Sequence, residues 1–273
     1  MGSRILSTIL LWSIVAAVVY FWGPAGGVWL LSIIAVLTLR EFFGLMRRLG
    51  VEPFDKGGLA AAAIICLGPL YFEPYGLSTQ VPLALAVILF AIRILGERSS
   101  QKRLDSLAWT LFGVLYIPFM LQFLGRIMLI ESPDAHTGLL LAVWIIAVSK
   151  FCDVGALLTG LAIGRHKMAP EISPKKTWEG AAGGVLTSMA IGAGIAYGGA
   201  SILPAGFTPW LAALIALPVA VLAIVSDLVE SIIKRQANAK DAGTTIPGIG
   251  GVFDLSDSLI LTSPIGYLVF SVI

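Results

Sequence analysis

The sequence predicts an all-α polytopic integral membrane protein, and three observations support this fold class. Of its 273 residues, 58% are hydrophobic and only 12% are charged, and the mean hydropathy is +0.93. This composition lies far outside that of soluble domains. Apolar runs approach the roughly 20 residues that a membrane helix needs. Lysine and arginine gather in alternate loops between these runs, as they do in membrane proteins of fixed orientation.

Nine apolar segments are the expected transmembrane helices of a single membrane domain spanning residues 1–273. They cover residues 5–22, 27–39, 57–72, 81–95, 107–130, 138–162, 180–200, 209–226 and 255–273. The first has the character of a signal peptide, but more spans follow it, so we expect it to remain as a helix. The second is short and should extend into flanking residues such as Arg40. Residues 1–137 form the amino-terminal helices, and residues 138–273 carry the predicted site.

The basic residues predict the orientation of the chain. They stand before the first helix and after the second, fourth, sixth and eighth helices, whereas segments 23–26, 73–80, 131–137 and 201–208 have none. Because such residues accumulate on the cytoplasmic side, the amino terminus should be cytoplasmic and the carboxyl terminus outside. The polar segments 163–179 and 227–254 then share the cytoplasmic face, in a bacterium that of the inner membrane. A net charge of +2 gives no indication of nucleic-acid binding.

The segment 180–200 carries small residues at four-residue spacing. These are Gly180, Gly184, Ser188 and Gly192. Such a stripe permits close approach of another helix. Packing within the chain and a homodimer interface both explain it.

Carboxylates gather around the last two apolar runs. Asp227 and Glu230 are three residues apart and Lys234 follows, so the three share one helix face if the preceding helix continues. Asp254 and Asp257 are again three apart, at the start of the final helix. Carboxylate oxygens are the ligands that Mg²⁺ takes in proteins. A solvated loop also carries such charges, but at an apolar boundary unpaired charge is costly. We therefore predict a metal site.

Two further features suit a phosphate group. Lys175 and Lys176 precede a helix start, which adds free N–H donors to their positive charge, although lysines at a membrane exit also follow from the orientation alone. Three glycines, Gly248, Gly250 and Gly251, let backbone N–H groups approach an anion, although a plain turn would need them too. Within the segment 138–162, Lys150 and Asp153 suggest an ion pair that is either functional or structural.

Taken together, these blocks resemble the signature of the phosphatidate cytidylyltransferases, or CDP-diacylglycerol synthases. The resemblance rests on Ser231-Ile-Ile-Lys-Arg235, then Lys240-Asp241, then Pro247-Gly-Ile-Gly-Gly-Val-Phe-Asp254 and Asp257-Ser258. The segments SPKKTWEG (173–180) and 153–156 are similar to other blocks of that family. The similarity covers about 145–265. The family usually has His where this chain has Ile249, and Arg where it has Leu255.

The resemblance implies transfer of the cytidylyl group of CTP to phosphatidic acid. The products would be pyrophosphate and CDP-diacylglycerol, an intermediate of phospholipid biosynthesis, and membrane lipids would surround the protein. It implies Mg²⁺ on Asp227, Asp254 and Asp257, with support from Glu230 and room for a second cation. The remaining catalytic positions would be Lys234, Lys240 and Asp241. The substrate-binding positions would be Lys150, Asp153, Ser173, Lys175, Lys176, Arg235, Gly248, Gly250 and Gly251.

Three alternatives stand beside this interpretation. A CTP-dependent lipid kinase of the polyprenol type would share the membrane body and phosphate loops but transfer the γ-phosphoryl group. A secondary transporter would concentrate charge at the bilayer midplane in repeated, broken helices, and no repeat is visible here. An inactive paralogue is supported only by Ile249 and Leu255. Because the carboxylates and basic residues of the signature are retained, we expect retained chemistry.

Overall fold

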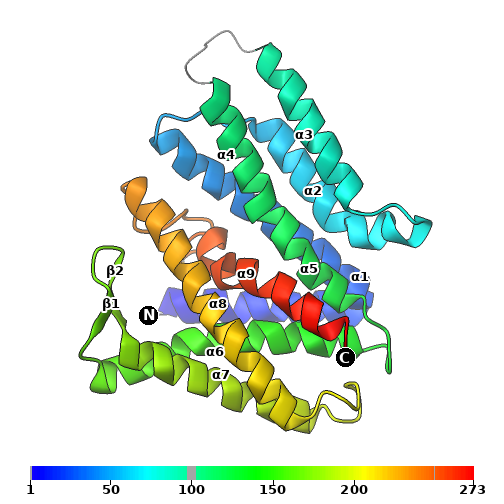
Figure 1. The fold of residues 1–273 in the computed structure, drawn as a ribbon, viewed down its shortest axis with the longest axis vertical. Helices are drawn as coiled ribbons and strands as arrows, with labels where there is room; N and C mark the ends of the chain where they lie inside the picture. Colours follow the sequence, from blue (N-terminus) through cyan, green and yellow to red (C-terminus); the bar gives the residue numbers. More distant parts are fainter. Residues whose placement is uncertain (1, 97–102, 249) are drawn as a thin grey trace. The chain divides into compact units, whose positions relative to one another are not determined.

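The computed structural model describes residues 2–96, 103–248 and 250–273, and most of them are helical (Figure 1). The helices are α1 (Gly2–Arg48), α2 (Asp55–Tyr71), the short 3₁₀ helix η1 (Glu73–Tyr75), α3 (Gln80–Leu95), α4 (Arg103–Tyr116), α5 (Pro118–Met128), α6 (Thr137–Ile163), α7 (Trp178–Gly198), α8 (Pro209–Gln236) and α9 (Val252–Phe270). This confirms the helical fold class. A small antiparallel hairpin, β1 (Lys167–Ala169) and β2 (Ser173–Thr177), was not expected.

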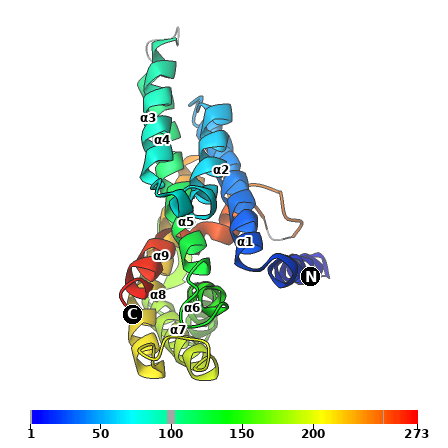
Figure 2. The same cartoon turned by 90° about the vertical axis from the view of Figure 1, so that its right-hand side faces the viewer.

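Among the described residues, six helical stretches are long and apolar enough to cross a membrane. They are Ile9–Arg48, Leu104–Met128, Thr137–Ile163, Trp178–Gly198, Pro209–Gln236 and Val252–Phe270. The expected count of nine is not confirmed. One reason is that the expected helices 5–22 and 27–39 lie in one element, α1, which bends at Gly23 (φ 58°, ψ −146°) and Pro24 (Figure 2). The predicted loop between them is therefore a kink.

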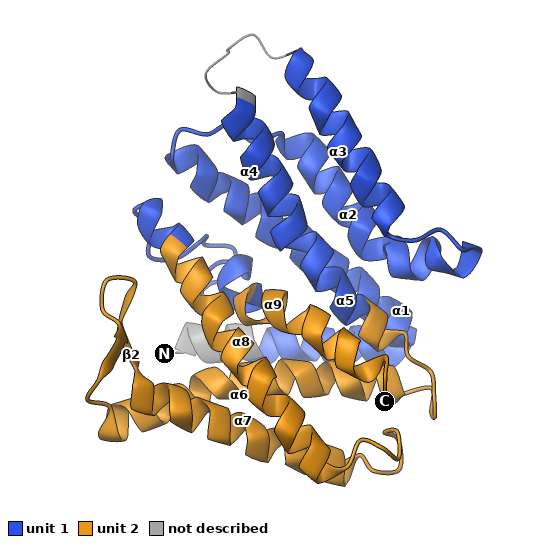
Figure 3. Ribbon diagram, viewed as in Figure 1, with its two compact units in different colours: residues 1–125, 233–256 blue, residues 126–232, 257–273 orange. Residues whose placement is uncertain are grey.

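The chain forms two compact units (Figure 3). Unit 1 contains residues 1–125 and 233–256, and unit 2 contains residues 126–232 and 257–273. Both α8 and α9 contribute to each unit. Each unit therefore has its own core and its own set of polar contacts.

An aromatic cluster forms the core of unit 1. The Phe42 ring of α1 lies 5.9 Å from Phe112 and 6.3 Å from both Trp109 and Phe253, measured between ring centroids. Phe42 and Phe253 are fully buried. Beside them, the buried hydroxyls of Thr38 and Ser256 are 2.9 Å apart. Helix α1 is thus held against α4 and the first turn of α9 by buried apolar side chains, and against α9 also by the Thr38–Ser256 contact.

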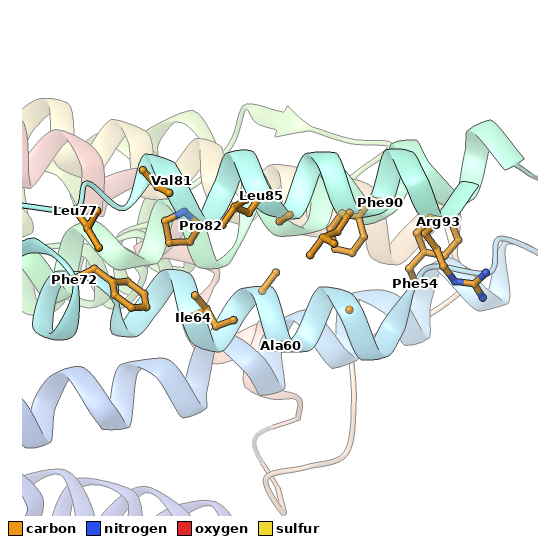
Figure 4. Close-up of a pocket in the computed structure, with 14 residues that line it drawn as sticks. Phe54, Ala60, Ile64, Phe72, Leu77, Val81, Pro82, Leu85, Phe90 and Arg93 are labelled. Carbon is orange, nitrogen blue, oxygen red and sulfur yellow. The ribbon is translucent and has the colours of Figure 1, made fainter. Parts of the chain in front are cut away.

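A second feature of unit 1 is an apolar groove of about 610 Å³ between α2 and α3 (Figure 4). Ile64, Leu85 and Phe90 are among the side chains that line it. Among the described residues, the charged one that lines it is Arg93, whose guanidinium lies 5.6 Å from the centre of the Phe54 ring. None of the predicted site residues lines this groove, so it is not where the phosphate and metal chemistry would take place.

In unit 2, α6 and α7 pack along their length through the small residues of α7. Ser188 Oγ donates a hydrogen bond of 2.7 Å to the Val148 carbonyl. Trp144 Nε1 donates one of 2.9 Å to the Gly192 carbonyl. Gly184 lies against Cys152 so closely that an added Cβ would come 2.6 Å from the Cys152 carbonyl oxygen. The small-residue stripe is therefore buried within the chain, and it does not require a homodimer to explain it.

The close contact at Gly184 gives a stability prediction. The substitution Gly184→Ala should destabilise the protein by about 1–3 kcal/mol, because the new methyl group overlaps a backbone atom and the two helices must separate. Thermal unfolding in detergent measures this effect. The matched control is Gly194→Ala in the same helix, where nothing lies within 4 Å of the added Cβ. Its stability should hold or rise slightly through helix propensity. Equal effects of the two changes would contradict the packing described above.

Candidate functional site

Three carboxylates meet in unit 2. One oxygen each from Asp227 and Glu230 of α8 and from Asp257 of α9 lie within 4.8 Å of one another. The expected continuation of the helix beyond residue 226 is confirmed, since α8 runs to Gln236 and places Asp227 and Glu230 one turn apart. Glu230 and Asp257 are only 1% and 5% exposed. All the donors are carboxylate oxygens, which is the donor set that suits a hard cation such as Mg²⁺.

Short polar contacts hold the helices of this cluster together. Ser226 Oγ donates a hydrogen bond to the backbone carbonyl of Asp257, which joins α8 to α9. The Ser149 hydroxyl of α6 lies 3.2 Å from that of Thr262 in α9. Asp257 Oδ1 also accepts a 2.6 Å hydrogen bond from the N–H of Ser258. In apolar surroundings such contacts fix the rotation of each helix, so the three carboxylates are presented on facing surfaces.

Two lysines compensate part of the negative charge. Lys150 Nζ of α6 lies 3.2 Å from Asp257 Oδ1, and Lys176 of β2 forms an ion pair with Asp227. A fourth carboxylate, that of Asp153, has Lys150, Lys176, Asp227 and Asp257 as its electrostatic neighbours. Asp227, Glu230, Asp257 and Asp153 thus bring four carboxylates into one part of unit 2. A divalent cation bound among them would add to the positive charge of the two lysines.

Lys150 has a carboxylate partner besides the expected Asp153. Three-residue spacing on α6 makes it an electrostatic neighbour of Asp153, and its ammonium also reaches across to Asp257 Oδ1 at 3.2 Å. Asp257 is nearly fully buried and Asp153 is only partly buried. The more strongly desolvated carboxylate has the greater need of a nearby cation.

The hairpin explains why only one of the two adjacent lysines joins the cluster. Successive side chains of a strand point to opposite faces, so Lys176 turns inward to Asp227 and Lys175 is exposed. Thr177 then caps α7 by accepting a 3.1 Å hydrogen bond from the Gly180 N–H. Ser173, at the start of β2, is half-buried. The predicted phosphate segment thus begins a strand and ends at a helix N-terminus.

The other predicted residues form a separate set of contacts in unit 1. Asp254 Oδ1 lies 2.6 Å from Lys234 Nζ. Its Oδ2 accepts hydrogen bonds from the N–H groups of Gly251, at 2.8 Å, and Ala242, at 3.0 Å. Among the described residues, the carboxylates close enough together to hold one metal ion are Asp227, Glu230 and Asp257, and Asp254 is not one of them. Asp254 therefore organises the polar loop between α8 and α9.

The glycine loop differs from the expected phosphate cradle. The N–H of Gly250 donates to the Ile246 carbonyl at 3.1 Å, and that of Gly251 is taken by Asp254. These two N–H groups are thus satisfied within the protein. Gly248 (φ 81°) and Gly250 (φ 131°) instead supply backbone conformations that other residues rarely adopt. Arg235, Lys240 and Asp241 are exposed on this polar segment, and Ile249 lies outside the described residues.

One residue that the sequence analysis missed is Glu41 of α1. Its Oε1 lies 2.5 Å from Thr245 Oγ1, and its Oε2 accepts a 2.9 Å hydrogen bond from the Phe253 N–H. The available signal was a carboxylate three residues after Thr38 in a largely apolar helix. That spacing places both residues on one face but does not reveal partners more than 200 positions away.

Comparison with known proteins agrees with the resemblance of the signature blocks. The model of the cytidylyltransferase family matches residues 2–273. A phosphatidate cytidylyltransferase of Synechocystis sp. is 28% identical over 264 residues, covering 87% of this chain and 85% of the relative. Proteins of the same name from Mycobacterium bovis and Brucella suis are 30% and 34% identical over 182 and 160 residues, or 65% and 59% of this chain. Those two alignments span 55% and 56% of the relatives.

The family match extends over the amino-terminal helices, for which the sequence alone offered only compatible hydropathy. It includes α1, which carries Glu41, as well as α8 and α9, which carry the carboxylates. The charged contacts of both units therefore lie within the matched region, and the chain belongs to the cytidylyltransferase family.

Proposed function

We propose that this protein transfers the cytidylyl group of CTP to phosphatidic acid, giving CDP-diacylglycerol and pyrophosphate. The observation that carries the proposal is the carboxylate cluster of Asp227, Glu230 and Asp257, partly balanced by Lys150 and Lys176, in a chain of the cytidylyltransferase family. The named relatives support the choice of phosphatidate as the acceptor. CTP and phosphatidic acid are accordingly the substrates, and membrane lipids surround the enzyme.

The reaction needs no protein nucleophile. A phosphate oxygen of phosphatidic acid, already anionic near neutral pH, forms a bond to the α-phosphorus of CTP. The bond from that phosphorus to the bridging oxygen of the β-phosphate breaks, and pyrophosphate leaves with the electron pair. The protein must hold two anions together in line, so positioning and charge stabilisation supply the catalysis.

The residues divide this task. Asp227, Glu230 and Asp257 would hold Mg²⁺, which when bound neutralises phosphate charge and polarises a phosphoryl oxygen. Lys176, at the edge of the hairpin, can exchange Asp227 for a phosphate oxygen, and exposed Lys175 lies next to it. Lys150 keeps the buried Asp257 carboxylate compensated. We propose that the nucleotide is bound by Lys234 and Arg235 at the end of α8 and by Lys240 and Asp241 in the polar loop that Asp254 orders. The described residues contain no second group of three carboxylates that could hold another cation.

Product analysis tests the reaction. Purified protein in detergent, with Mg²⁺, phosphatidic acid and CTP labelled at the α- or γ-phosphate, should place the α-label in the lipid. Label from the γ-phosphate would instead establish a lipid kinase. If neither labelled form of CTP gives labelled lipid, although an unfolding transition shows that the protein is folded, a transporter or an inactive paralogue would remain and the proposal would fail.

The metal assignment predicts different behaviour for two aspartates of α9. The substitution Asp257→Asn should lower kcat by about 100-fold or more and raise the Mg²⁺ concentration for half-maximal rate, because a ligand is lost. The substitution Asp254→Asn should lower activity without changing that Mg²⁺ concentration, because Asp254 holds Lys234 and the loop. Titration of the initial rate with Mg²⁺ measures both. An unchanged Mg²⁺ dependence in Asp257→Asn would remove the metal assignment.

We also propose the topology that the loop charges predict, with the nine apolar segments crossing a bacterial inner membrane, the amino terminus in the cytoplasm and the carboxyl terminus outside. An impermeant maleimide added to intact spheroplasts should label an Asp134→Cys variant and leave a Lys175→Cys variant unlabelled until the cells are opened. Background labelling should be low, because Cys66 and Cys152 are both buried. The reverse pattern would place the site on the outer face.

A further inference from the structure

Glu41 connects the end of α1 to the polar loop that joins α8 and α9. Within unit 1 its two carboxylate oxygens have different partners: Oε1 meets the Thr245 hydroxyl at 2.5 Å, and Oε2 accepts from the Phe253 N–H at 2.9 Å. Thr245 lies in the loop, and Phe253 lies in the first turn of α9. One side chain therefore connects the loop to the start of the helix that follows it, at two positions eight residues apart.

The loop is built around this carboxylate. A Cβ added to Gly251 would come 2.9 Å from the Glu41 carboxyl carbon, and one added to Gly243 would come 3.1 Å from Glu41 Cγ, with still closer approaches to other atoms of the same side chain. Only glycine lets the backbone approach so closely on both sides. The glycine at position 251, which the sequence suggested for phosphate, is thus explained by its contact with Glu41 and its hydrogen bond to Asp254.

Two carboxylates share the ordering of the loop. Glu41 takes the Phe253 N–H, and Asp254 takes the N–H groups of Ala242 and Gly251. Asp254 also holds Lys234, which is a signature residue. The first turn of α9 is further fixed to α1 because the Phe42 and Phe253 rings are in contact. A change at Glu41 would therefore be felt by the segment that carries Lys240 and Asp241.

We propose that Glu41 is a positioning residue, which holds residues 242–248 and 250–253 in the conformation that binds CTP. This inference rests on the proposed function. It assigns a role in nucleotide binding to the amino-terminal helices, outside the signature blocks. Glu41 acts through the hydrogen bonds of the loop, so hydrogen-bonding geometry should matter more than its negative charge.

The substitutions Glu41→Ala and Glu41→Gln separate these two contributions. Glu41→Ala loses both contacts and should raise the KM for CTP about tenfold or more, because each contact is a hydrogen bond to a charged group. The KM for phosphatidic acid and the Mg²⁺ dependence should stay unchanged. Glu41→Gln should remain within about threefold of wild type, since its amide oxygen can accept from Phe253 and its NH₂ can donate to the Thr245 hydroxyl. Thr245→Val, which removes one partner at an exposed site, should be intermediate.

Hydrogen exchange gives a readout that does not depend on activity. Amides of residues 242–246, 248 and 250–253 should exchange faster in Glu41→Ala than in wild type. The control Glu131→Ala, which changes an exposed carboxylate in the segment before α6, should alter neither exchange nor the KM for CTP. Unchanged exchange in Glu41→Ala would show that the contacts do not order the loop. Faster exchange with an unchanged KM for CTP would reduce Glu41 to a structural anchor. Equal losses in Glu41→Gln and Glu41→Ala would mean that its charge acts directly. If no CTP reaction is found at all, the proposed function fails while the exchange result still tests the loop.

Discussion

Carboxylates placed within apolar helices must be brought close to positive charge or to hydrogen-bond donors, and both units of this protein are arranged around that requirement. In unit 2, Asp257 is nearly buried and has Lys150, while Asp227 has Lys176 from the hairpin. The close approach of three carboxylate oxygens makes the cluster a suitable place for a divalent cation. In unit 1, Asp254 is compensated by Lys234 and two backbone N–H groups.

Hydroxyl groups complete this arrangement by fixing helices to one another. Ser188 donates to a carbonyl of α6, and Ser226 donates to the carbonyl of Asp257 itself. The Thr38 and Ser256 hydroxyls bond to each other and so connect α1 to the first turn of α9. Apolar side chains alone would let these helices rotate about their axes with little penalty, because lipid and helix surfaces are similarly apolar. The hydroxyl contacts therefore decide which helix faces carry the carboxylates inward.

The sequence could predict features that depend on local spacing. The shared face of Asp227 and Glu230 and the small-residue stripe of α7 follow from helical periodicity, and both are found. Partners distant in the chain could not be read in this way. Spacing suggested Asp153 as the partner of Lys150, whereas the hydrogen-bonded partner, Asp257, comes from a second helix, α9. Likewise the sequence around Glu41 does not indicate its contacts with Thr245 and Phe253. Gly251, which lies against Glu41, suggested phosphate binding instead.

The same contacts bear on Leu255, one of the two departures from the family signature. Leu255 replaces an arginine next to Asp254, which would suggest a carboxylate deprived of its cation. In the structure, however, Lys234 lies 2.6 Å from Asp254, and the second carboxylate oxygen accepts two N–H groups. The charge of Asp254 is therefore compensated without residue 255, and half-buried Leu255 adds apolar surface at the start of α9. The carboxylates of unit 2 and their lysines are also retained, so neither the metal cluster nor the compensation of Asp254 depends on an arginine at position 255.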